Sequence, residues 1–264
     1  MNRSRITVDP AAFPDGIRPF VFNADVYDSS SSEAARVYYI DAEGGLFLKR
    51  CSAASLEKEA AMTGYFHSLG LSAEVLAYLS ADGFDWLVTR RVPGEDCTHP
   101  SHLSQPERLC DIMGEQLRRL HGLTPEGCPV RDKLDMYKAD TASGISKGIY
   151  VPKHIKEVYP FSSPEEARQW AEKGLRLLKA DTLVHGDYCL PNILLDGWRF
   201  SGFIDLGGAG VADRHIDLFW GIWSLNYNLH TPRYTDRFLD AYGRDGIDPD
   251  KLRCVAAMET VSDG

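Results

Sequence analysis

The first part of the chain alternates between short apolar runs and polar turns, a pattern that predicts mainly β-strands. The apolar runs lie at 20–22, 37–40, 46–48, 75–79 and 86–89. Gly44 and Gly45 separate the second run from the third and predict a hairpin turn. One helix is expected from about Ser55 to Leu69, because apolar residues recur there at helical spacing and Gly70 suits a helix end.

Beyond residues 91–96, R-V-P-G-E-D, the apolar positions follow the helical period. We therefore place a boundary there and predict two domains, 1–92 rich in strands and 93–264 mainly helical, which together make an α+β fold. A helix is expected from Ser104 to His121, opened by a capping box of Ser104 with Glu107. A second helix is expected to start at Ser163, with Glu166 completing another capping box. The pattern leaves 131–160 unassigned.

Composition narrows the class of protein. The chain has 264 residues, of which 44% are hydrophobic and 25% charged, as in soluble globular proteins. It contains no run of about 20 apolar residues that would cross a membrane, and its first residues lack the apolar core of a secretion signal. The six cysteines include no C-x-x-C pair. We therefore expect free thiols and a cytoplasmic location.

The formal net charge is −9. An acidic surface argues against a nucleic-acid partner, which normally requires basic patches. It suits a cationic small-molecule substrate, because complementary charge raises local concentration. An acidic surface that serves only solubility explains the charge equally well, so charge alone does not decide between the two.

The most informative segment, residues 183–195, reads L-V-H-G-D-Y-C-L-P-N-I-L-L. Asp187 and Asn192 interrupt an otherwise apolar stretch. Asp196-Gly197 then predicts a hairpin, after which the chain reaches Asp205. Because a hairpin brings its outer ends together, the side-chain oxygens of Asn192 and Asp205 are expected to meet. Sparse oxygen ligands of this kind suit Mg²⁺, whose remaining ligands are water and phosphate oxygens.

This combination of groups suits phosphoryl transfer. Asp187 would orient an attacking hydroxyl and accept its proton. Asn192 and Asp205 would hold Mg²⁺ on the phosphates of a nucleotide. The protein would then act mainly by positioning and by neutralising charge.

The same residues carry a family resemblance. Asp187, Asn192 and Asp205 reproduce the D-x-x-x-x-N…D spacing of protein-kinase-like enzymes. H-G-D at 185–187 and G-F-I-D at 202–205 resemble aminoglycoside phosphotransferases, and G-V-A-D-R-x-x-D at 210–217 is most similar to the aminoglycoside 3′-phosphotransferases. The similarity extends back through V-P-G-x-D at 92–96 to Lys49.

The resemblance implies a two-lobed protein-kinase-like fold, with an antiparallel sheet and one helix in the N-lobe and a mainly helical C-lobe. The implied reaction is Mg²⁺-dependent transfer of the γ-phosphoryl group of ATP or GTP to a hydroxyl of an aminoglycoside antibiotic. The implied position is the 3′-hydroxyl, and the implied result is antibiotic resistance. The close alternative keeps this chemistry with another small-molecule hydroxyl as acceptor.

The resemblance also assigns nucleotide-binding residues in the first domain. Lys49 would reach the α- and β-phosphates, and Glu59 would pair with Lys49 and hold it. The glycine-rich loop of protein kinases is absent, and D-S-S-S-S-E at 28–33 takes its place. The hydroxyls of Ser31 and Ser32 would contact phosphate oxygens there, although a solvated loop explains these serines equally well.

Residues around the motif receive supporting roles. His185 is expected to stabilise the loop through hydrogen bonds, and Asp217 to brace the loop backbone. Cys189 is interpreted as a small spacer. His121 is interpreted as a cation that compensates the dipole at a helix end.

The acceptor side is where the sequence departs from the family. Related 3′-phosphotransferases carry acidic residues in the segment that matches 219–228, whereas this chain has Trp223, Ser224 and Tyr227. The aromatic run 219–228 is expected to build a helical core, and part of it would line the acceptor pocket. The acidic groups considered as replacements are Glu157, Glu165, Glu166, Glu259, Asp263 and the terminal carboxylate.

Two hypotheses from other classes are kept. In a metal-dependent phosphohydrolase, His185, Asp187, Asp205 and His215 would form the metal cluster, but Lys49 and Glu59 would have no role. In a binding module without activity, the complete set of lysine, glutamate, aspartates and asparagine would have no purpose.

Overall fold

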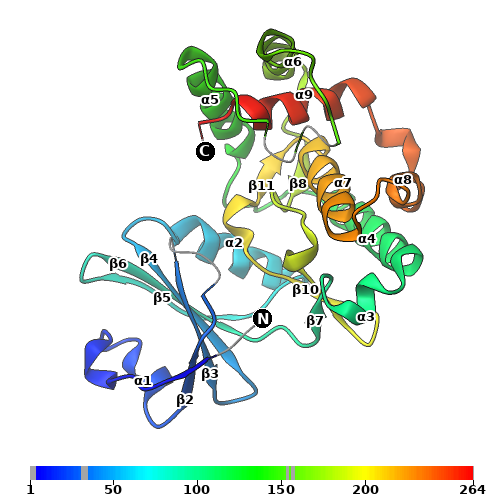
Figure 1. The fold of residues 1–264 in the computed structure, drawn as a ribbon. Coiled ribbons are helices and arrows are strands. Elements are labelled where there is room, and N and C mark those ends of the chain that lie inside the picture. The colour runs from blue at the N-terminus through cyan, green and yellow to red at the C-terminus, as the bar shows by residue number, and fades with distance from the viewer. Residues whose placement is uncertain (1–3, 31–34, 153–154, 156–157, 264) are drawn as a thin grey trace. The chain divides into compact units, whose positions relative to one another are not determined.

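The structure is a computed structural model that describes residues 4–30, 35–152, 155 and 158–263 (Figure 1). The chain forms two compact units. The first is Met1–Gly94 with Ser201–Gly207, and the second is Glu95–Phe200 with Gly208–Gly264. The predicted domain division between 92 and 93 stays a prediction.

The first unit is built on a six-stranded sheet with the order β1-β2-β3-β4-β6-β5. Neighbouring strands are antiparallel throughout. The strands are β1 (Ser4–Ile6), β2 (Asp25–Asp28), β3 (Arg36–Asp41), β4 (Leu46–Ser52), β5 (Val75–Ala81) and β6 (Phe84–Arg90). The predicted strand runs 37–40, 46–48, 75–79 and 86–89 lie within β3, β4, β5 and β6, which confirms these four predictions.

The predicted helix of this unit is α2 (Glu57–Ser68), which packs on the sheet. Leu56 and Ala60 are buried against Leu87 of β6. The buried carboxylate of Asp85, also on β6, accepts a hydrogen bond from Leu56 N at 2.9 Å. This bond fixes the start of α2 relative to the sheet, because an unpaired backbone N–H at a helix start gains a charged partner.

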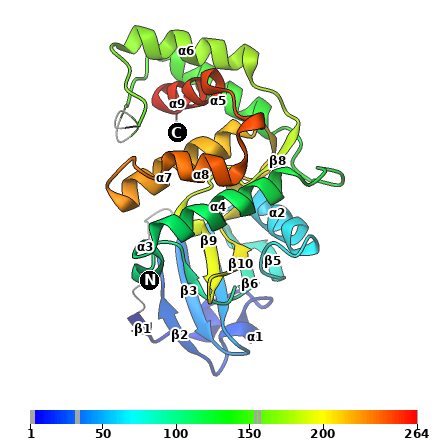
Figure 2. The same cartoon turned by 90° about the vertical axis from the view of Figure 1, so that its right-hand side faces the viewer.

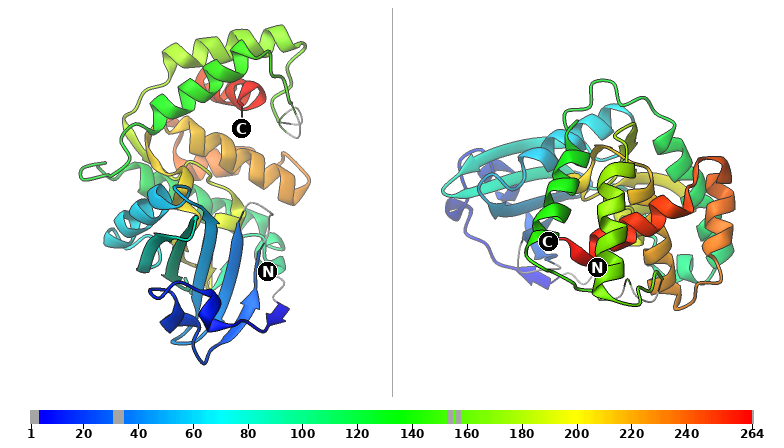
Figure 3. Two further views of the ribbon diagram at one scale, coloured as in Figure 1. Left: turned by 90° about the vertical axis from the view of Figure 1, so that its left-hand side faces the viewer. Right: turned by 90° about the horizontal axis from the view of Figure 1, so that it is seen from above.

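The prediction of a strand at 20–22 is wrong, because Arg18–Val21 form the short helix α1, preceded by the turn η1 (Pro10–Ala12). Pro19 sits in the first turn of α1, where its missing N–H costs nothing. Ile17 and Val21 are buried with Ile40 and Val88 in an apolar cluster on the sheet. The segment from Pro10 to Val21, dark blue in Figure 3, therefore covers the sheet and adds no strand after β1.

The second unit is mainly helical (Figure 2). Its helices are α3 (Pro100–Leu103), α4 (Pro106–His121), α5 (Lys133–Ser146), α6 (Pro164–Leu177), α7 (His215–Leu229), α8 (Thr235–Tyr242) and α9 (Pro249–Val261). Helix α6 packs along α9, α4 packs along α8, and α7 contacts α4, α8 and α9. Within the described residues, no helix combines the length and the apolarity that a membrane crossing requires.

Two short sheets complete the strands of the chain. One pairs β8 (Thr182–Val184) with β11 (Gly210–Ala212), and both strands are buried. The other has the order β10-β9-β7, formed by β7 (Glu95–Asp96), β9 (Ile193–Asp196) and β10 (Arg199–Phe203). Gly197 and Trp198 lie between β9 and β10 with positive φ values of 54° and 66°. The predicted hairpin is therefore confirmed, with its central residues one position later than Asp196-Gly197.

The capping predictions had different outcomes. Ser163 caps α6 as predicted, because its hydroxyl accepts a hydrogen bond from Glu166 N at 3.1 Å. The Glu166 carboxylate accepts from Ser162 N at 2.7 Å, one residue before the position that a capping box requires. The capping box of Ser104 with Glu107 is wrong: Ser104 ends the preceding helix α3, and its hydroxyl donates to Ser101 O. Helix α4 starts at Pro106 instead. The unassigned segment 131–160 contains α5, whose apolar positions are too few for a clear helical pattern.

Candidate active site

The H-G-D motif of the sequence lies on a loop that leaves the buried strand β8. The carboxylate of Asp217, buried in the first turn of α7, accepts hydrogen bonds from the backbone N–H groups of His185 and Gly186, each at 2.7 Å. A charged acceptor makes these bonds stronger than neutral ones. The predicted bracing role of Asp217 is confirmed, and the backbone immediately before Asp187 is held in one place.

Gly186 allows the loop to pass close to a neighbouring segment. Its φ is +82°, and a Cβ atom at this position would lie 1.9 Å from the carbonyl oxygen of Gly208. A side chain is excluded both by this contact and by the backbone conformation. Glycine is therefore required one residue before the candidate catalytic aspartate.

Asp187 and Asn192 are brought together within the loop. The amide nitrogen of Asn192 donates to Oδ2 of Asp187 at 2.8 Å and to the Asp187 carbonyl oxygen at 3.0 Å. Asn192 is buried in the turn η3 (Leu190–Asn192), and Asp187 is half-buried. Because its nitrogen is engaged, Asn192 offers its amide oxygen as the atom for a cation. His185 contributes a hydrogen bond from Asp187 N to its Nδ1 at 3.3 Å, which agrees with its predicted supporting role.

Buried groups hold the rest of the loop from behind. The hydroxyl of the fully buried Tyr188 donates to Met113 O in α4 at 2.8 Å. The backbone N–H of Leu190 donates to the hydroxyl of Ser224 in α7 at 3.0 Å. Burial, and then the nearby Asp187, raise the pKa of the Cys189 thiol well above its ordinary value. A thiol that resists ionisation is a poor nucleophile, which fits the prediction that Cys189 is a spacer.

His121 is the supporting residue that the sequence interpretation missed. Its Nε2 lies 3.1 Å from Oδ2 of Asp217, and its Nδ1 lies 2.9 Å from the hydroxyl of Tyr242. Burial lowers the pKa of His121, so the neutral ring donates from Nε2 to Asp217 and accepts from Tyr242 at Nδ1. The explanation by the helix dipole is therefore wrong. In the sequence, the position of His121 one helical turn after the apolar Leu117 was the signal that this histidine faces the interior.

The first unit brings Lys49 and Glu59 together, as the resemblance predicts. The ammonium of Lys49, on β4, lies 2.7 Å and 3.0 Å from the two carboxylate oxygens of Glu59, in the first turn of α2. It also lies 2.9 Å from Oδ1 of Asp205. Burial works against the charge on Lys49, but Glu59 and Asp205 outweigh it and hold the lysine pKa above its ordinary value. Burial raises the pKa of Glu59, and Lys49 opposes that shift.

Asp205 follows β10 in the segment that belongs to the first unit. The backbone N–H of Phe203 donates to Leu71 O at 2.7 Å and ties this segment to the unit. Asp205 has a φ of +58°, and 54% of its side chain is exposed. Carboxylate and amide oxygens are hard ligands, so Asp205 and Asn192 both fit Mg²⁺ chemically. Asn192 belongs to the other unit, and the predicted meeting of these two side chains stays a prediction.

Four predicted positions lie outside the described residues: Ser31 and Ser32 of the proposed phosphate-contacting loop, and Glu157 and the terminal carboxylate of Gly264 among the acceptor candidates. The phosphohydrolase hypothesis finds no support in the described part of the chain, where no group of three or more His, Cys, Asp or Glu side chains could hold a metal ion. His215 instead bonds through Nδ1 to Asp213 and through Nε2 to the backbone N–H of Asp248.

Most acidic candidates for the acceptor side are already engaged. Glu165 pairs with Arg168, Glu166 with Arg253, and Asp263 with Lys147. Glu259, in α9, differs, because its hydrogen-bond partners are the uncharged Tyr137, at 2.8 Å, and Trp220. Burial raises the Glu259 pKa to about 7, and the charge of Asp187 adds to the shift. Among the described acidic candidates, Glu259 thus lies within electrostatic reach of Asp187.

Sequence comparison finds close relatives over the whole chain. It is 44% identical, over 260 residues that cover 98% of each chain, to a probable aminoglycoside 3′-phosphotransferase of Lactococcus lactis. It is 36% identical to an aminoglycoside 3′-phosphotransferase of Niallia circulans, over 67% of each chain.

Solved structures share the fold. An aminoglycoside 3′-phosphotransferase of type VIII superposes with a TM-score of 0.72 at 23% identity, over 98% of this chain and 93% of that one. An aminoglycoside phosphotransferase of Streptomyces rimosus in complex with ADP and streptomycin superposes with a TM-score of 0.69 at 24% identity. The superposition covers 87% of this chain and 91% of that one. The predicted protein-kinase-like fold, an antiparallel sheet with a helix and a mainly helical unit, is confirmed.

The profile of the phosphotransferase enzyme family matches residues 29–254, which include Lys49, Glu59, Asp187, Asn192 and Asp205. Together with a relative that spans 98% of the chain, this match shows that the chain belongs to the phosphotransferase enzyme family that includes the aminoglycoside phosphotransferases.

Proposed function

We propose that this protein transfers the γ-phosphoryl group of ATP or GTP to the 3′-hydroxyl of an aminoglycoside in a Mg²⁺-dependent reaction. The observation that carries the proposal is the arrangement of Asp187, which Asn192 orients by a 2.8 Å hydrogen bond while Asp217 holds the backbone before it. The acceptor class follows from the relatives, of which the one from Lactococcus lactis is 44% identical over 98% of each chain.

Asp187 acts as the general base in this proposal. Its carboxylate orients the acceptor hydroxyl and takes the proton as the oxygen attacks the γ-phosphorus. Asn192 keeps Oδ2 of Asp187 in one orientation, so that Oδ1 is the oxygen left to face the hydroxyl. Such fixed orientation lowers the entropic part of the barrier.

Lys49 and Glu59 serve the nucleotide. Glu59 holds the ammonium of Lys49, which remains charged and contacts the α- and β-phosphates. Asn192 and Asp205 are the residues that would hold Mg²⁺. The ion would neutralise charge on the phosphate oxygens during transfer.

The acidic character of the protein favours a cationic acceptor. The net charge is −9, and Glu259 lies within the electrostatic influence of Asp187. An ammonium group of the acceptor beside Glu259 would stabilise the ionised carboxylate. We therefore assign Glu259 to recognition of an acceptor ammonium group. Another amine-bearing alcohol remains the alternative acceptor for the same chemistry.

A transfer assay with purified protein tests this function. ATP and GTP are each supplied with Mg²⁺ against kanamycin-type, neomycin-type and non-aminoglycoside acceptors, and phosphorylated acceptor is measured by mass spectrometry. We expect phosphorylated aminoglycoside only when nucleotide and Mg²⁺ are both present. Transfer confined to non-aminoglycoside acceptors would contradict the acceptor assignment and leave the chemistry standing.

Lys49→Ala separates a kinase from a phosphohydrolase. A kinase should lose most of its activity, because the nucleotide phosphates lose their lysine. Lys173→Ala is the matched control, since Lys173 forms an exposed pair with Asp250. Hydrolysis of a phosphoester that is unaffected in Lys49→Ala would overturn the assignment as a kinase.

The cellular role needs its own measurement. The described structure contains six free cysteines, as expected for a reducing compartment, and we propose a cytoplasmic location. Expression in a susceptible bacterium should raise the inhibitory concentration of the aminoglycosides phosphorylated in vitro. An unchanged inhibitory concentration would mean that the activity does not amount to resistance.

A further inference from the structure

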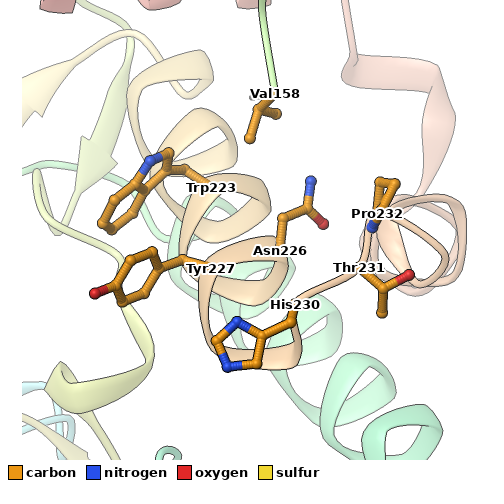
Figure 4. A pocket seen from close by; sticks show the side chains of 7 residues that line it. All are labelled: Val158, Trp223, Asn226, Tyr227, His230, Thr231 and Pro232. Atoms are coloured by element: carbon orange, nitrogen blue, oxygen red, sulfur yellow. The ribbon is translucent and has the colours of Figure 1, made fainter. Parts of the chain in front are cut away.

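Two cavities of the second unit differ in chemical character. One, of about 350 Å³, lies at the outer end of α7 beside Trp223 and Tyr227 (Figure 4). None of its seven described lining residues is an arginine, a lysine or an acid. The other, the arginine cavity, has a volume of about 430 Å³ and is lined in part by Arg118 and Arg214. The proposed function assigns no role to the arginine cavity.

The two arginines reach this cavity from different helices. Arg118 lies in the last turn of α4, and Arg214 directly precedes α7. Both guanidinium groups lie against the turn at 243–246. Nη1 of Arg118 is 3.8 Å from the position that a Cβ atom of Gly243 would take, and Nη1 of Arg214 is 2.7 Å from the corresponding position at Gly246. The glycines of this turn therefore leave room for the two groups.

A chain of hydrogen bonds holds the side chain of Arg214 in place. Arg214 donates to the hydroxyl of the buried Tyr242. That hydroxyl lies 2.9 Å from Nδ1 of His121, and Nε2 of His121 lies 3.1 Å from Oδ2 of Asp217. A guanidinium group has five N–H donors, so the bond to Tyr242 fixes Arg214 and leaves further donors for a ligand in the cavity.

The charges around the arginine cavity favour an anion. Within the described part of the chain, no carboxylate lies within ion-pair distance of Arg118 or Arg214. Burial lowers the pKa of His121, and the charge of Arg214 also lowers it, so the imidazole is neutral. The carboxylate of Asp245 lines the cavity and opposes an anion, but this side chain is exposed. Two guanidinium groups thus face one carboxylate, and an anion in the cavity relieves their mutual repulsion.

From these observations we infer that Arg118 and Arg214 form a binding site for a phosphate group, either free phosphate or the phosphate of a small ester. A guanidinium group pairs with two phosphate oxygens at once, and its charge strengthens these hydrogen bonds. The inference does not depend on the proposed function, because none of these residues is assigned to the nucleotide, to Mg²⁺ or to the acceptor. The chain from Arg214 to Asp217 connects the site with the brace of the catalytic loop.

Thermal unfolding at rising phosphate concentration, without nucleotide, tests the site. Phosphate stabilises proteins in general because it is excluded from their surface, so a chloride series at equal ionic strength gives the background. We expect a rise in Tm of the wild type that saturates, as for a bound ligand. Arg118→Ala should raise the Kd about threefold and Arg214→Ala about tenfold. Arg119→Ala is the control, since Arg119 is exposed and does not line the cavity.

Asp245→Asn should change the affinity in the opposite direction. It removes the carboxylate that opposes the anion, so we expect the Kd for phosphate to fall about threefold. Asp181→Asn is its control, because it removes an equal charge from an exposed position that does not line the cavity. A Kd that is the same in wild type, Arg118→Ala and Asp245→Asn would overturn the inference. A rise in Tm that does not saturate in the wild type would overturn it as well.

Two further arms identify where and what the protein binds. Saturating stabilisation that is lost in Lys49→Ala and kept in Arg118→Ala would place the phosphate at the proposed nucleotide site and overturn the inference. Glycerol 2-phosphate replaces phosphate in a second titration. A lower Kd for this ester, sensitive to Arg118→Ala, indicates a phosphorylated small molecule as ligand, and an equal Kd indicates free phosphate.

Folding of the variants is checked by circular dichroism. Arg118 and Asp245 are exposed, so both of their variants should fold. Arg214→Ala loses the bond to Tyr242, and Arg118→Ala with Asp245→Asn carries the test if that variant is unfolded. Absence of aminoglycoside transfer would overturn the proposed function and leave this site standing, because the titrations contain neither nucleotide nor acceptor.

Discussion

The catalytic loop at 185–192 and the outer end of α7 lie in the same unit but are held in different ways. The loop has a charged, buried brace in Asp217, a glycine that tolerates no side chain, and tyrosine and serine hydroxyls behind it. The outer end of α7 presents exposed or half-buried aromatic rings to a cavity. The candidate catalytic loop is thus held by several independent contacts, whereas the aromatic surface at the outer end of α7 is held by fewer.

This difference has a physical origin. A general base must be positioned to within a few tenths of an ångström, and the backbone N–H groups of His185, Gly186 and Asp187 each have a hydrogen-bond partner. An aromatic face binds a ring without one required orientation, because dispersion and burial are not directional. Substitutions should accordingly affect kcat at the loop and KM at the outer end of α7.

The largest effect is expected for Asp187→Ala. Loss of the general base should lower kcat by about 10²–10⁴-fold, while nucleotide binding is retained. Single-turnover transfer and nucleotide titration measure the two properties separately. Asp181→Ala, at an exposed aspartate just before β8, is the control. Transfer at the wild-type rate in Asp187→Ala would remove Asp187 from the role of base.

A smaller loss is expected for Gly186→Ala. The added Cβ would meet the carbonyl oxygen of Gly208 at 1.9 Å, so the loop must move. A displacement of about 1 Å near the reacting groups costs on the order of 10²-fold in rate. Gly148→Ala is a matched control, since Gly148 also has a positive φ, of +67°, and no heavy atom lies within 4 Å of the added Cβ. Equal activities of the two variants would show that the close approach of the loop does not matter.

Asp217→Asn tests the brace itself. The substitution removes the charge that two backbone N–H groups and His121 share. We expect the free energy of unfolding to fall by about 2–4 kcal/mol. The measurement is urea unfolding with an unchanged m-value, and Asp245→Asn, at an exposed aspartate, is the control. Unfolding midpoints that coincide for wild type and Asp217→Asn would contradict the brace.

The smallest effect is expected for Glu259→Gln, and it depends on pH. The folded pKa of Glu259 is raised by burial from 4.5 to about 7, so between these values the folded protein holds more protons than the unfolded chain. The wild type should lose stability as pH rises through this window, and the Gln variant should not. We expect Glu259→Gln to be more stable by about 1–3 kcal/mol at pH 8 and to match the wild type near pH 4.

Thermal unfolding at a series of pH values measures this difference. A stability difference that shrinks as pH rises would contradict the assigned direction of the Glu259 pKa. A stability difference between the variant and the wild type that stays constant over pH would show that packing, and not ionisation of Glu259, causes the effect.

The contacts within the pairs Asp187–Asn192 and Lys49–Glu59 were predictable, because the family resemblance assigns fixed residue types at fixed spacing. Asp187 and Asn192 lie on one tight loop, and their contact follows from local sequence. Lys49 and Glu59 are predictable for the same reason, since a strand followed by a helix brings them together. The four strand predictions succeeded because β3 to β6 have apolar residues that face a buried surface.

The failures share a different cause, which is dependence on distant partners. His121 was misjudged because Asp217 and Tyr242, which bury and neutralise it, are remote in sequence. The run at 20–22 has strand-like residues, but its position as a cover over the sheet makes it helical. The segment 219–228 was predicted only as an aromatic run, because the stacking of Trp223 on Tyr227 and the cavity beside them depend on the three-dimensional structure.

The central claim is transfer of a phosphoryl group from a nucleotide to the 3′-oxygen of an aminoglycoside. Phosphorus–proton correlation NMR of the purified product of a reaction with ATP and Mg²⁺ tests it most directly. We predict a phosphate coupled to the proton at the 3′ position, with one ADP formed for each acceptor modified. Free inorganic phosphate with an unmodified acceptor would contradict the claim, as would a phosphate on an acceptor that is not an aminoglycoside.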